Sequence, residues 1–176
     1  MSQVNNATVQ TSSVNFSNVT GARSPQLALA MLMLQLADTN KQAAMNGIKE
    51  IEGEQAKKKE ISEVLNKARE YKSSGLHLND AGIPSGIDDK FTKFCKDNGI
   101  TVPHYEKYAD SKEKLDAKWD IAIAQLQTKM DNTGADIQTK MVQLQDLMGQ
   151  YNSYTSGANT AIAKSNDILS SLARGQ

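Results

Sequence analysis

Aromatic residues and cysteine are scarce in this sequence. Phe, Trp and Tyr together make up 5% of its 176 residues, and Cys95 is the single cysteine. One cysteine excludes an internal disulfide framework and any zinc site built from several cysteines. So few aromatics disfavour a large aromatic core, whereas seams of Leu, Ile, Met and Ala between helices remain possible. The composition therefore favours a helical bundle or coiled coil over a β-sandwich.

Net charge and membrane-spanning apolar runs are also missing. Twenty basic and twenty acidic residues give a formal net charge of zero. This balance supplies neither the footprint of nucleic-acid binding nor a membrane-seeking surface, and it removes a barrier to self-association. The apolar run at residues 27–37 is too short to span a bilayer, and Asp38 closes it. The run also lacks the flanking features of a cleavable signal peptide.

The sequence contains no recognisable catalytic, nucleotide-binding or metal-binding motif. Its glycines form no phosphate loop, and neither His77 nor His104 has a partner at metal-ligand spacing. Cys95 and His104 could form a thiol nucleophile and its base, but Cys95 shares a predicted apolar face with Phe91 and Phe94, where a thiol is usually a core residue. We therefore predict a non-enzymatic protein without cofactor, metal or small-molecule substrate. A small hydrolase using Cys95 remains an alternative.

Helix signals divide the chain into an arm, two long helices and a middle segment. Residues 1–24 have one charge, Arg23, and no helical period, which predicts a disordered N-terminal arm. Ser24-Pro25 is typical of a helix start, and Ser73-Ser74-Gly75 of a helix end. We predict one helical domain over residues 25–176, with a helix over 25–72, a loop and short helix over 73–110, and a helix over 111–174.

The middle segment contains the pattern of a short amphipathic helix. Between Ser85 and Asn98, apolar residues share one face, and Asn98-Gly99 supplies a left-handed stop. The loops on either side return the chain on itself, so we predict that the two long helices pair antiparallel. The predicted fold class is all-α, with an antiparallel coiled-coil hairpin and a less regular middle region.

Apolar residues of the long helices recur at helical spacing. From Ile137 to Leu172 the steps alternate between four and three, a 3.5-residue repeat that keeps one seam facing a partner helix. The alternation fails around Met130, Thr133 and Gly134, which predicts a stutter with a kink or local break. The residues predicted to form the seam, and to mediate self-assembly and chaperone binding, are Leu27, Met31, Leu34, Met45, Ile48, Ile137, Met141, Leu144, Met148, Tyr151, Ile162, Leu169 and Leu172.

The run at 27–37 places apolar side chains on nearly all sides of a helix. Such a helix must be buried on several sides. Two interpretations remain open at this point. The run is either the central helix of a monomeric bundle or a surface that other proteins cover, a chaperone before assembly and sister subunits afterwards.

Three stretches of the chain have a distinctive layout: LALAMLMLQLADTNKQAAMNGIKEIE at 27–52, IPSGIDDKFTKFCKDNGITVPHYEKYA at 83–109, and IQTKMVQLQDLMGQYNSYTSGANTAIAKSNDILSSLARGQ at 137–176. Together they resemble the filament or needle-tip-extension subunits of bacterial type III secretion systems, the family that contains EspA and SseB. The middle stretch, with Asp97-Asn98-Gly99-Ile100, is the most specific of the three. None of them is a catalytic signature, so the resemblance concerns layout and local similarity.

The resemblance implies a secreted structural subunit. It implies export through the type III apparatus with an uncleaved signal in residues 1–24, and polymerisation into a helical extracellular filament that conducts effectors and translocators to host cells. The implied partners are copies of the chain, a cytoplasmic secretion chaperone, the needle subunit and translocator proteins, without nucleic acid. Two alternatives remain: a monomeric hydrophilic needle-tip protein of the same system, and a cytoplasmic helical adaptor or chaperone.

Overall fold

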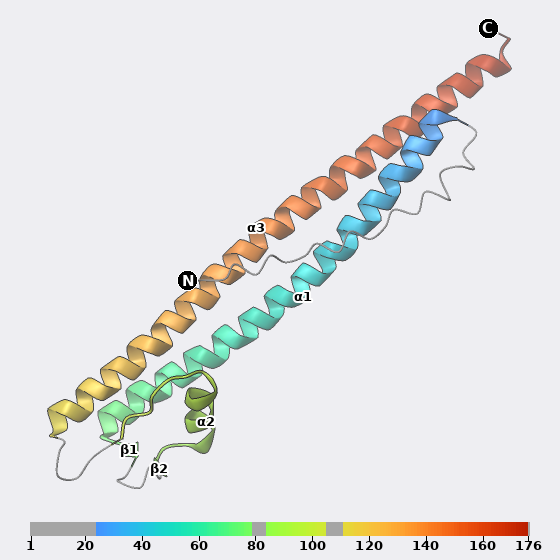
Figure 1. The fold of residues 1–176 in the computed structure, drawn as a ribbon. Helices are drawn as coiled ribbons and strands as arrows, with labels where there is room; N and C mark the ends of the chain where they lie inside the picture. Colours follow the sequence, from blue (N-terminus) through green and yellow to red (C-terminus); the bar gives the residue numbers. More distant parts are fainter. Residues whose placement is uncertain (1–23, 79–83, 105–110, 176) are drawn as a thin grey trace. The chain divides into compact units, whose positions relative to one another are not determined.

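Two long helices and a small middle segment make up the described part of the chain. The computed structural model describes residues 24–78, 84–104 and 111–175 (Figure 1). Helix α1 spans Pro25–Ser74, helix α2 spans Asp89–Asp97 and helix α3 spans Lys112–Ala173. Strands β1 (His77–Leu78) and β2 (Pro84–Ser85) form a short antiparallel pair between α1 and α2. The predicted N-terminal arm lies outside the described residues, apart from Ser24.

Helix α1 begins and ends at the signals present in the sequence. The Ser24 hydroxyl accepts a hydrogen bond from the Leu27 amide at 3.1 Å, which satisfies one of the free amides of the first turn. At the other end Gly75 has a φ of +67°, and the Leu76 amide donates to the Tyr71 carbonyl at 2.9 Å. Gly75 thus forms a left-handed cap, a backbone conformation that residues with a Cβ adopt only at a cost in free energy. The predicted start and end of the first long helix are confirmed.

Helix α2 is capped in the same way. Its N-cap is Asp88, whose carboxylate accepts a hydrogen bond from the Lys90 amide at 2.8 Å. Its end is closed by Gly99, at a φ of +67°, and by the Ile100 amide, which donates to the Cys95 carbonyl at 2.8 Å. The predicted short helix between Ser85 and Asn98 is therefore confirmed, including its glycine stop.

Helices α1 and α3 pack against each other as an antiparallel hairpin. Contacts between them step in opposite directions along the two helices. The Ser24 and Ser165 hydroxyl oxygens lie 3.1 Å apart. The side-chain amide of Asn40 donates a hydrogen bond to the side-chain oxygen of Gln150 at 3.1 Å. Near the other ends of the two helices, Lys72 pairs with Asp120. The predicted antiparallel pairing and helical-hairpin fold are confirmed.

The chain divides into two compact units that both contain parts of the long helices. Unit 1 comprises residues up to 49 and from 141, and unit 2 comprises residues 50–140. The buried core of unit 1 is small and consists of Ala30, Ala158 and Ala161. The core of unit 2 is large, and its most completely buried side chains include Trp119, Phe91 and Leu126. None of the described helices is long and apolar enough to cross a membrane.

Candidate assembly surface

An inner seam on α3 faces α1. Its positions alternate by four and three residues from Trp119 to Ser165, and every side chain in the series is buried or half-buried. This spacing is the heptad repeat of a coiled coil. The members are Trp119, Ile123, Leu126, Met130, Thr133, Ile137, Lys140, Leu144, Leu147, Tyr151, Tyr154, Ala158, Ala161 and Ser165.

The predicted stutter and break near Met130 are wrong. Helix α3 is continuous from Lys112 to Ala173. The alternation also runs through the region without interruption, because the seam passes through Lys140 and not through the neighbouring Met141. A pattern of apolar residues alone selects the methionine, and that choice displaces the repeat by one residue and produces an apparent stutter.

The inner seam of α1 is built from small residues in unit 1. Ala30, Ala37 and Ala44 are buried at intervals of seven, and Ile51 continues the interval at the start of unit 2. Small side chains allow the facing helix to come close. At Gly157 of α3, an added Cβ would lie 2.7 Å from the Met33 sulfur. On the α1 side, unit 1 is therefore held by a close contact in which the fully buried side chains are small.

The structure distributes the thirteen predicted seam residues over three environments. Ile137 is buried, and four others are half-buried: Met31, Leu144, Tyr151 and Ile162. Eight are exposed: Leu27, Leu34, Met45, Ile48, Met141, Met148, Leu169 and Leu172. The predicted seam is therefore wrong as a description of the contact between α1 and α3 at most of its α1 positions. On α3 it is wrong at every second predicted position. On α1 the contact selects small side chains, whereas the prediction weighed apolarity, and on α3 the seam passes through Lys140, which an apolar pattern omits. The role of the thirteen residues in assembly stays a prediction.

A second stripe of side chains runs along α1 beside the inner seam. We call it the outer stripe, and its members are Leu27, Met31, Leu34, Asp38, Lys41, Met45 and Ile48. At about 100° per residue, it lies roughly a quarter turn around the helix from the alanine positions. Leu34, Met45 and Ile48 are 45%, 51% and 44% exposed. In unit 1, α3 thus covers one face of the apolar run, which disfavours the interpretation of that run as a buried central helix.

The end of α3 carries further exposed apolar residues. The hydroxyl contact between Ser24 and Ser165 lies at the first turn of α1, and α3 continues to Ala173. Ile168 and Leu172 continue the spacing of the inner seam, yet Leu172 is 66% exposed. Monomeric proteins rarely expose large contiguous apolar patches. Where such patches occur, they mark interaction surfaces.

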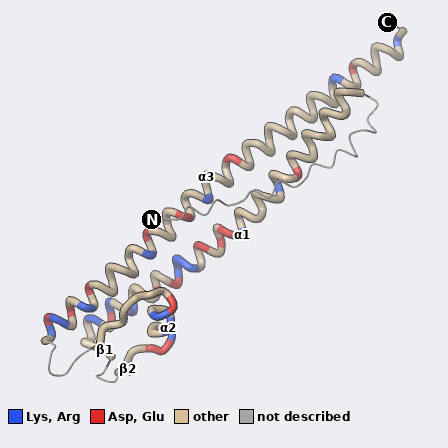
Figure 2. Tube along the Cα trace, in the orientation of Figure 1, with Lys and Arg blue, Asp and Glu red and all other residues tan. Residues whose placement is uncertain are grey.

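Charge is distributed unequally between the two units (Figure 2). From Ser24 to Ile48 the charged residues are Asp38 and Lys41, whereas residues 50–74 contain twelve. The α3 segment at 141–173 contains three charged residues, and the segment at 112–140 contains ten. Unit 1 therefore has few charged residues on its long helices, two of which lie in the outer stripe, whereas unit 2 is strongly charged.

A polar layer interrupts the inner seam at the edge of unit 2. The Lys140 ammonium lies 3.2 Å from a Glu50 carboxylate oxygen and 3.6 Å from one of Glu54. A hydrogen bond with Glu50 raises the pKa of Lys140. A hydrogen bond from Lys57 lowers the pKa of Glu54, so both Lys140 and Glu54 are shifted toward their charged forms.

Cys95 belongs to the core of unit 2. It is fully buried with Phe91 and Trp119, and Phe94 packs against the same cluster. Burial raises the pKa of the Cys95 thiol to about 11. The thiol is therefore protonated at neutral pH and is a poor nucleophile. The predicted apolar setting of Cys95 is confirmed.

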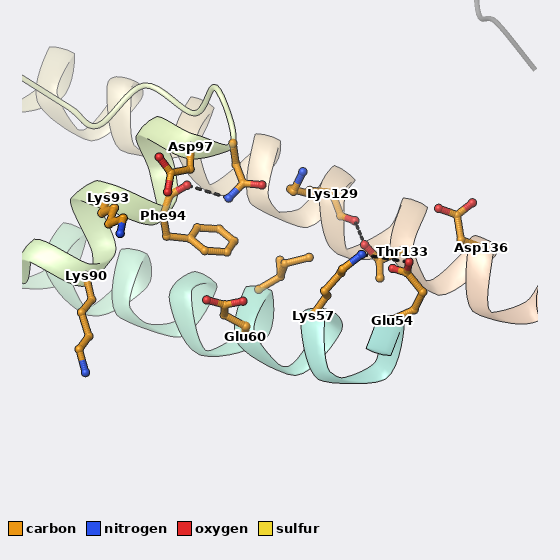
Figure 3. Close-up of a pocket in the computed structure, with 12 residues that line it drawn as sticks. Glu54, Lys57, Glu60, Lys90, Lys93, Phe94, Asp97, Lys129, Thr133 and Asp136 are labelled. Atoms are coloured by element: carbon orange, nitrogen blue, oxygen red, sulfur yellow. Dashed lines mark hydrogen bonds and ion pairs between the residues drawn. The ribbon is translucent and has the colours of Figure 1, made fainter. Parts of the chain in front are cut away.

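A cleft of about 780 Å³ lies between α1, α2 and α3 in unit 2 (Figure 3). Phe94 points into it from α2, and four lysines and four carboxylates surround it. The ionic residues are Glu54, Lys57, Glu60, Lys90, Lys93, Asp97, Lys129 and Asp136. Charges of both signs balance, and the lining residues include no histidine, serine or cysteine. The cleft is thus a polar surface in which opposite charges balance.

Both histidines take part in hydrogen bonds near the middle segment. The His77 ring lies 2.9 Å from the Gly75 carbonyl, and the His104 carbonyl accepts a hydrogen bond from Lys118 at 2.8 Å. Both rings are half-buried. Among the described residues, no three His, Cys, Asp or Glu side chains are grouped so as to hold a metal ion.

Comparison with known proteins returns no match to the chain among family models, curated proteins or solved structures. The resemblance to the secretion-filament subunits therefore stays a prediction from sequence. The functional argument consequently depends on the exposed apolar surface of unit 1.

Proposed function

We propose that this chain is a structural subunit that is exported by a type III secretion system and assembles with copies of itself into an extracellular filament. In this role a cytoplasmic chaperone covers its apolar surface before export. The needle subunit and translocator proteins are then its neighbours in the assembled apparatus. The outer stripe and the end of α3 are the surfaces that assembly buries.

The observation that carries this proposal is the outward placement of large apolar side chains in unit 1. Leu34, Met45 and Ile48 are each more than two-fifths exposed, although buried alanines line the inner seam of the same helix. Moving an aliphatic side chain of this size from water into a contact contributes about 1.5–3 kcal/mol. A helix that presents such residues along several turns is stabilised strongly by a partner.

Two features of unit 2 disfavour the hydrolase alternative. The Cys95 thiol is buried and protonated at neutral pH, because its pKa is raised to about 11. Cys95 is also absent from the lining of the cleft in the same unit. A Cys95→Ser variant should therefore be exported and assemble like the parent.

Electron microscopy of the purified full chain tests the proposal. Filaments are the expected result, and a Leu34→Asp variant should lose them because a carboxylate in a buried contact is costly. Asn46→Asp is the matched control, since Asn46 is an exposed residue of the same helix outside the outer stripe. A parent protein that stays unassembled under all conditions would contradict the filament assignment.

Location distinguishes the remaining alternatives. Secretion can be followed by comparing the culture supernatant of the source bacterium with that of a strain whose export apparatus is inactivated. Protein in the supernatant of the intact strain alone supports export by that apparatus. Protein retained in the cytoplasm of both strains contradicts it and favours the helical adaptor. Export without filaments favours a monomeric needle-tip protein.

A further inference from the structure

The outer stripe of α1 has a palindromic layout. From Met31 to Ile48 its members follow one another at steps of three, four, three, four and three residues. The same series is obtained when the helix is read in the opposite direction. The two apolar ends, Met31 with Leu34 and Met45 with Ile48, flank a central charged pair. A stripe with this symmetry can match a second copy of itself.

We infer that the outer stripe pairs with the outer stripe of a second copy of this chain, in an antiparallel and two-fold symmetric contact. In that pairing Met31 faces the second copy's Ile48, and Leu34 faces its Met45. An isologous contact uses one patch on both subunits, so each pair occurs twice. The inference rests on the proposed self-assembly and specifies its first step.

Charge fixes the direction of the pairing. Asp38 and Lys41 are the charged residues between Ser24 and Ile48, and both are exposed. The antiparallel arrangement places each Asp38 opposite the Lys41 of the other copy. A parallel arrangement would instead place like charges together, which is destabilising in a contact of low polarity. The complementarity of this pair therefore identifies the occupant as a second copy.

The geometry of α1 is compatible with two contacts at once. The inner seam and the outer stripe lie on adjacent faces of the helix, so a second copy can approach without displacing α3. Steps of three and four residues suit knobs-into-holes packing in the outer contact. The resulting dimer is closed, so growth into a filament requires another surface, such as the exposed residues Ile168 and Leu172 at the end of α3.

Sedimentation of the purified full chain over a wide concentration range measures the dimer. Asp38→Lys should weaken it, because two attractive pairs become two repulsive ones, and the dissociation constant should rise about tenfold or more. Lys41→Asp should do the same. The double variant Asp38→Lys with Lys41→Asp should restore the dimer, since it exchanges the charges without changing their complementarity. Lys49→Asp, an equal charge change outside the stripe, should leave the dimer unchanged.

Disulfide formation between chains tests the direction of pairing. In a Cys95→Ala background, chains with Leu34→Cys mixed with chains with Met45→Cys should cross-link efficiently. Leu34→Cys chains alone should not, since equivalent Leu34 positions lie about eleven residues apart along the contact. Circular dichroism of each variant establishes that it is folded.

Three results would overturn the inference: a parent chain that is monomeric at every concentration, a double charge exchange that fails to restore the dimer, or preferential cross-linking of Leu34→Cys with itself. Its failure is separable from failure of the proposed function. A dimer with the expected charge dependence but without filaments contradicts the filament assignment alone. If the chain forms filaments but its association in solution is unchanged by the substitutions at Asp38 and Lys41, the inferred dimer alone is contradicted.

Discussion

Unit 1 and unit 2 use the same two helices in opposite ways. In unit 2 the large side chains point inward, where Tyr71, Phe91 and Trp119 contact one another with ring centroids 5.1–6.1 Å apart. In unit 1 the fully buried apolar residues are alanines, and several large aliphatic side chains of α1 are exposed. Burial of large apolar groups dominates folding stability. Unit 2 therefore has a large apolar core, whereas unit 1 has a small one and exposes several large apolar side chains.

The contrast explains why one unit is highly charged and the other is not. Solvated lysines and carboxylates surround the core of unit 2, which keeps that surface from associating. Unit 1 has few charges on a stripe that we propose is covered in the assembly. A charged residue there would be desolvated on association, unless an opposite charge faces it as Lys41 is proposed to face Asp38.

The largest effect is expected from removing the centre of unit 2. Trp119→Ala should lower the free energy of unfolding by about 3–5 kcal/mol, because it leaves a large cavity. It also removes the hydrogen bond from the indole to the Leu76 carbonyl, at 2.9 Å. Urea denaturation followed by circular dichroism measures the change. Ile121→Ala, on the exposed face of the same helix, should change stability by less than about 0.5 kcal/mol. Equal losses in the two variants would remove the distinction between core and surface.

A smaller effect is expected when the alanine seam of unit 1 is overfilled. Ala44→Leu places three more carbon atoms between two closely packed helices and should cost about 1–3 kcal/mol. Met45→Leu changes the adjacent residue on the outer stripe and should be nearly neutral for the isolated chain. Thermal unfolding of both variants provides the comparison. If Ala44→Leu is as stable as the parent, the seam does not depend on small residues.

The smallest effect is expected from acidic pH, which should weaken the contact between α2 and α1. Asp88 caps α2 and pairs with Lys67, and its backbone amide donates to the Tyr71 hydroxyl at 3.2 Å. The hydrogen bond from Lys67 lowers the pKa of Asp88 from its ordinary value of 3.8. A lowered pKa gives stability that is present above pH 3.8 and is lost as the pH falls through the lower folded value.

Asp88→Asn should therefore reduce the loss of stability in acid. Thermal unfolding at neutral pH and near pH 3 measures the slope for the parent and the variant. Asp97→Asn is a suitable control, because Asp97 is an exposed carboxylate at the opposite end of the same helix. Identical slopes for the parent and Asp88→Asn would show that this pair does not contribute to acid sensitivity.

The sequence was sufficient to locate the helices but insufficient to locate their contact. Ser24-Pro25, Gly75 and Gly99 act through local backbone geometry, so their effect can be predicted from neighbouring residues alone. The inner seam depends on which side chains fit between two helices. Alanine is preferred there for its size and Lys140 for its ionic partners, and neither stands out in a pattern of apolar residues. The proposed assembly surface on α1 stands out in the sequence for the same reason that the seam of α1 does not: its exposed residues include large apolar side chains, whereas its buried residues are alanines.

Lys140 has a consequence for how the hairpin avoids errors of alignment. A heptad repeat permits two helices to slide past each other by seven residues and to recover a similar pattern of contacts. In the observed alignment Lys140 meets Glu50 and Glu54. A shift of one heptad in one direction would move it toward Lys58, and a shift in the other direction would move it toward Ala44. Both misaligned states would leave an ammonium group without its carboxylates, so a single lysine gives the folding chain one correct position among several similar ones.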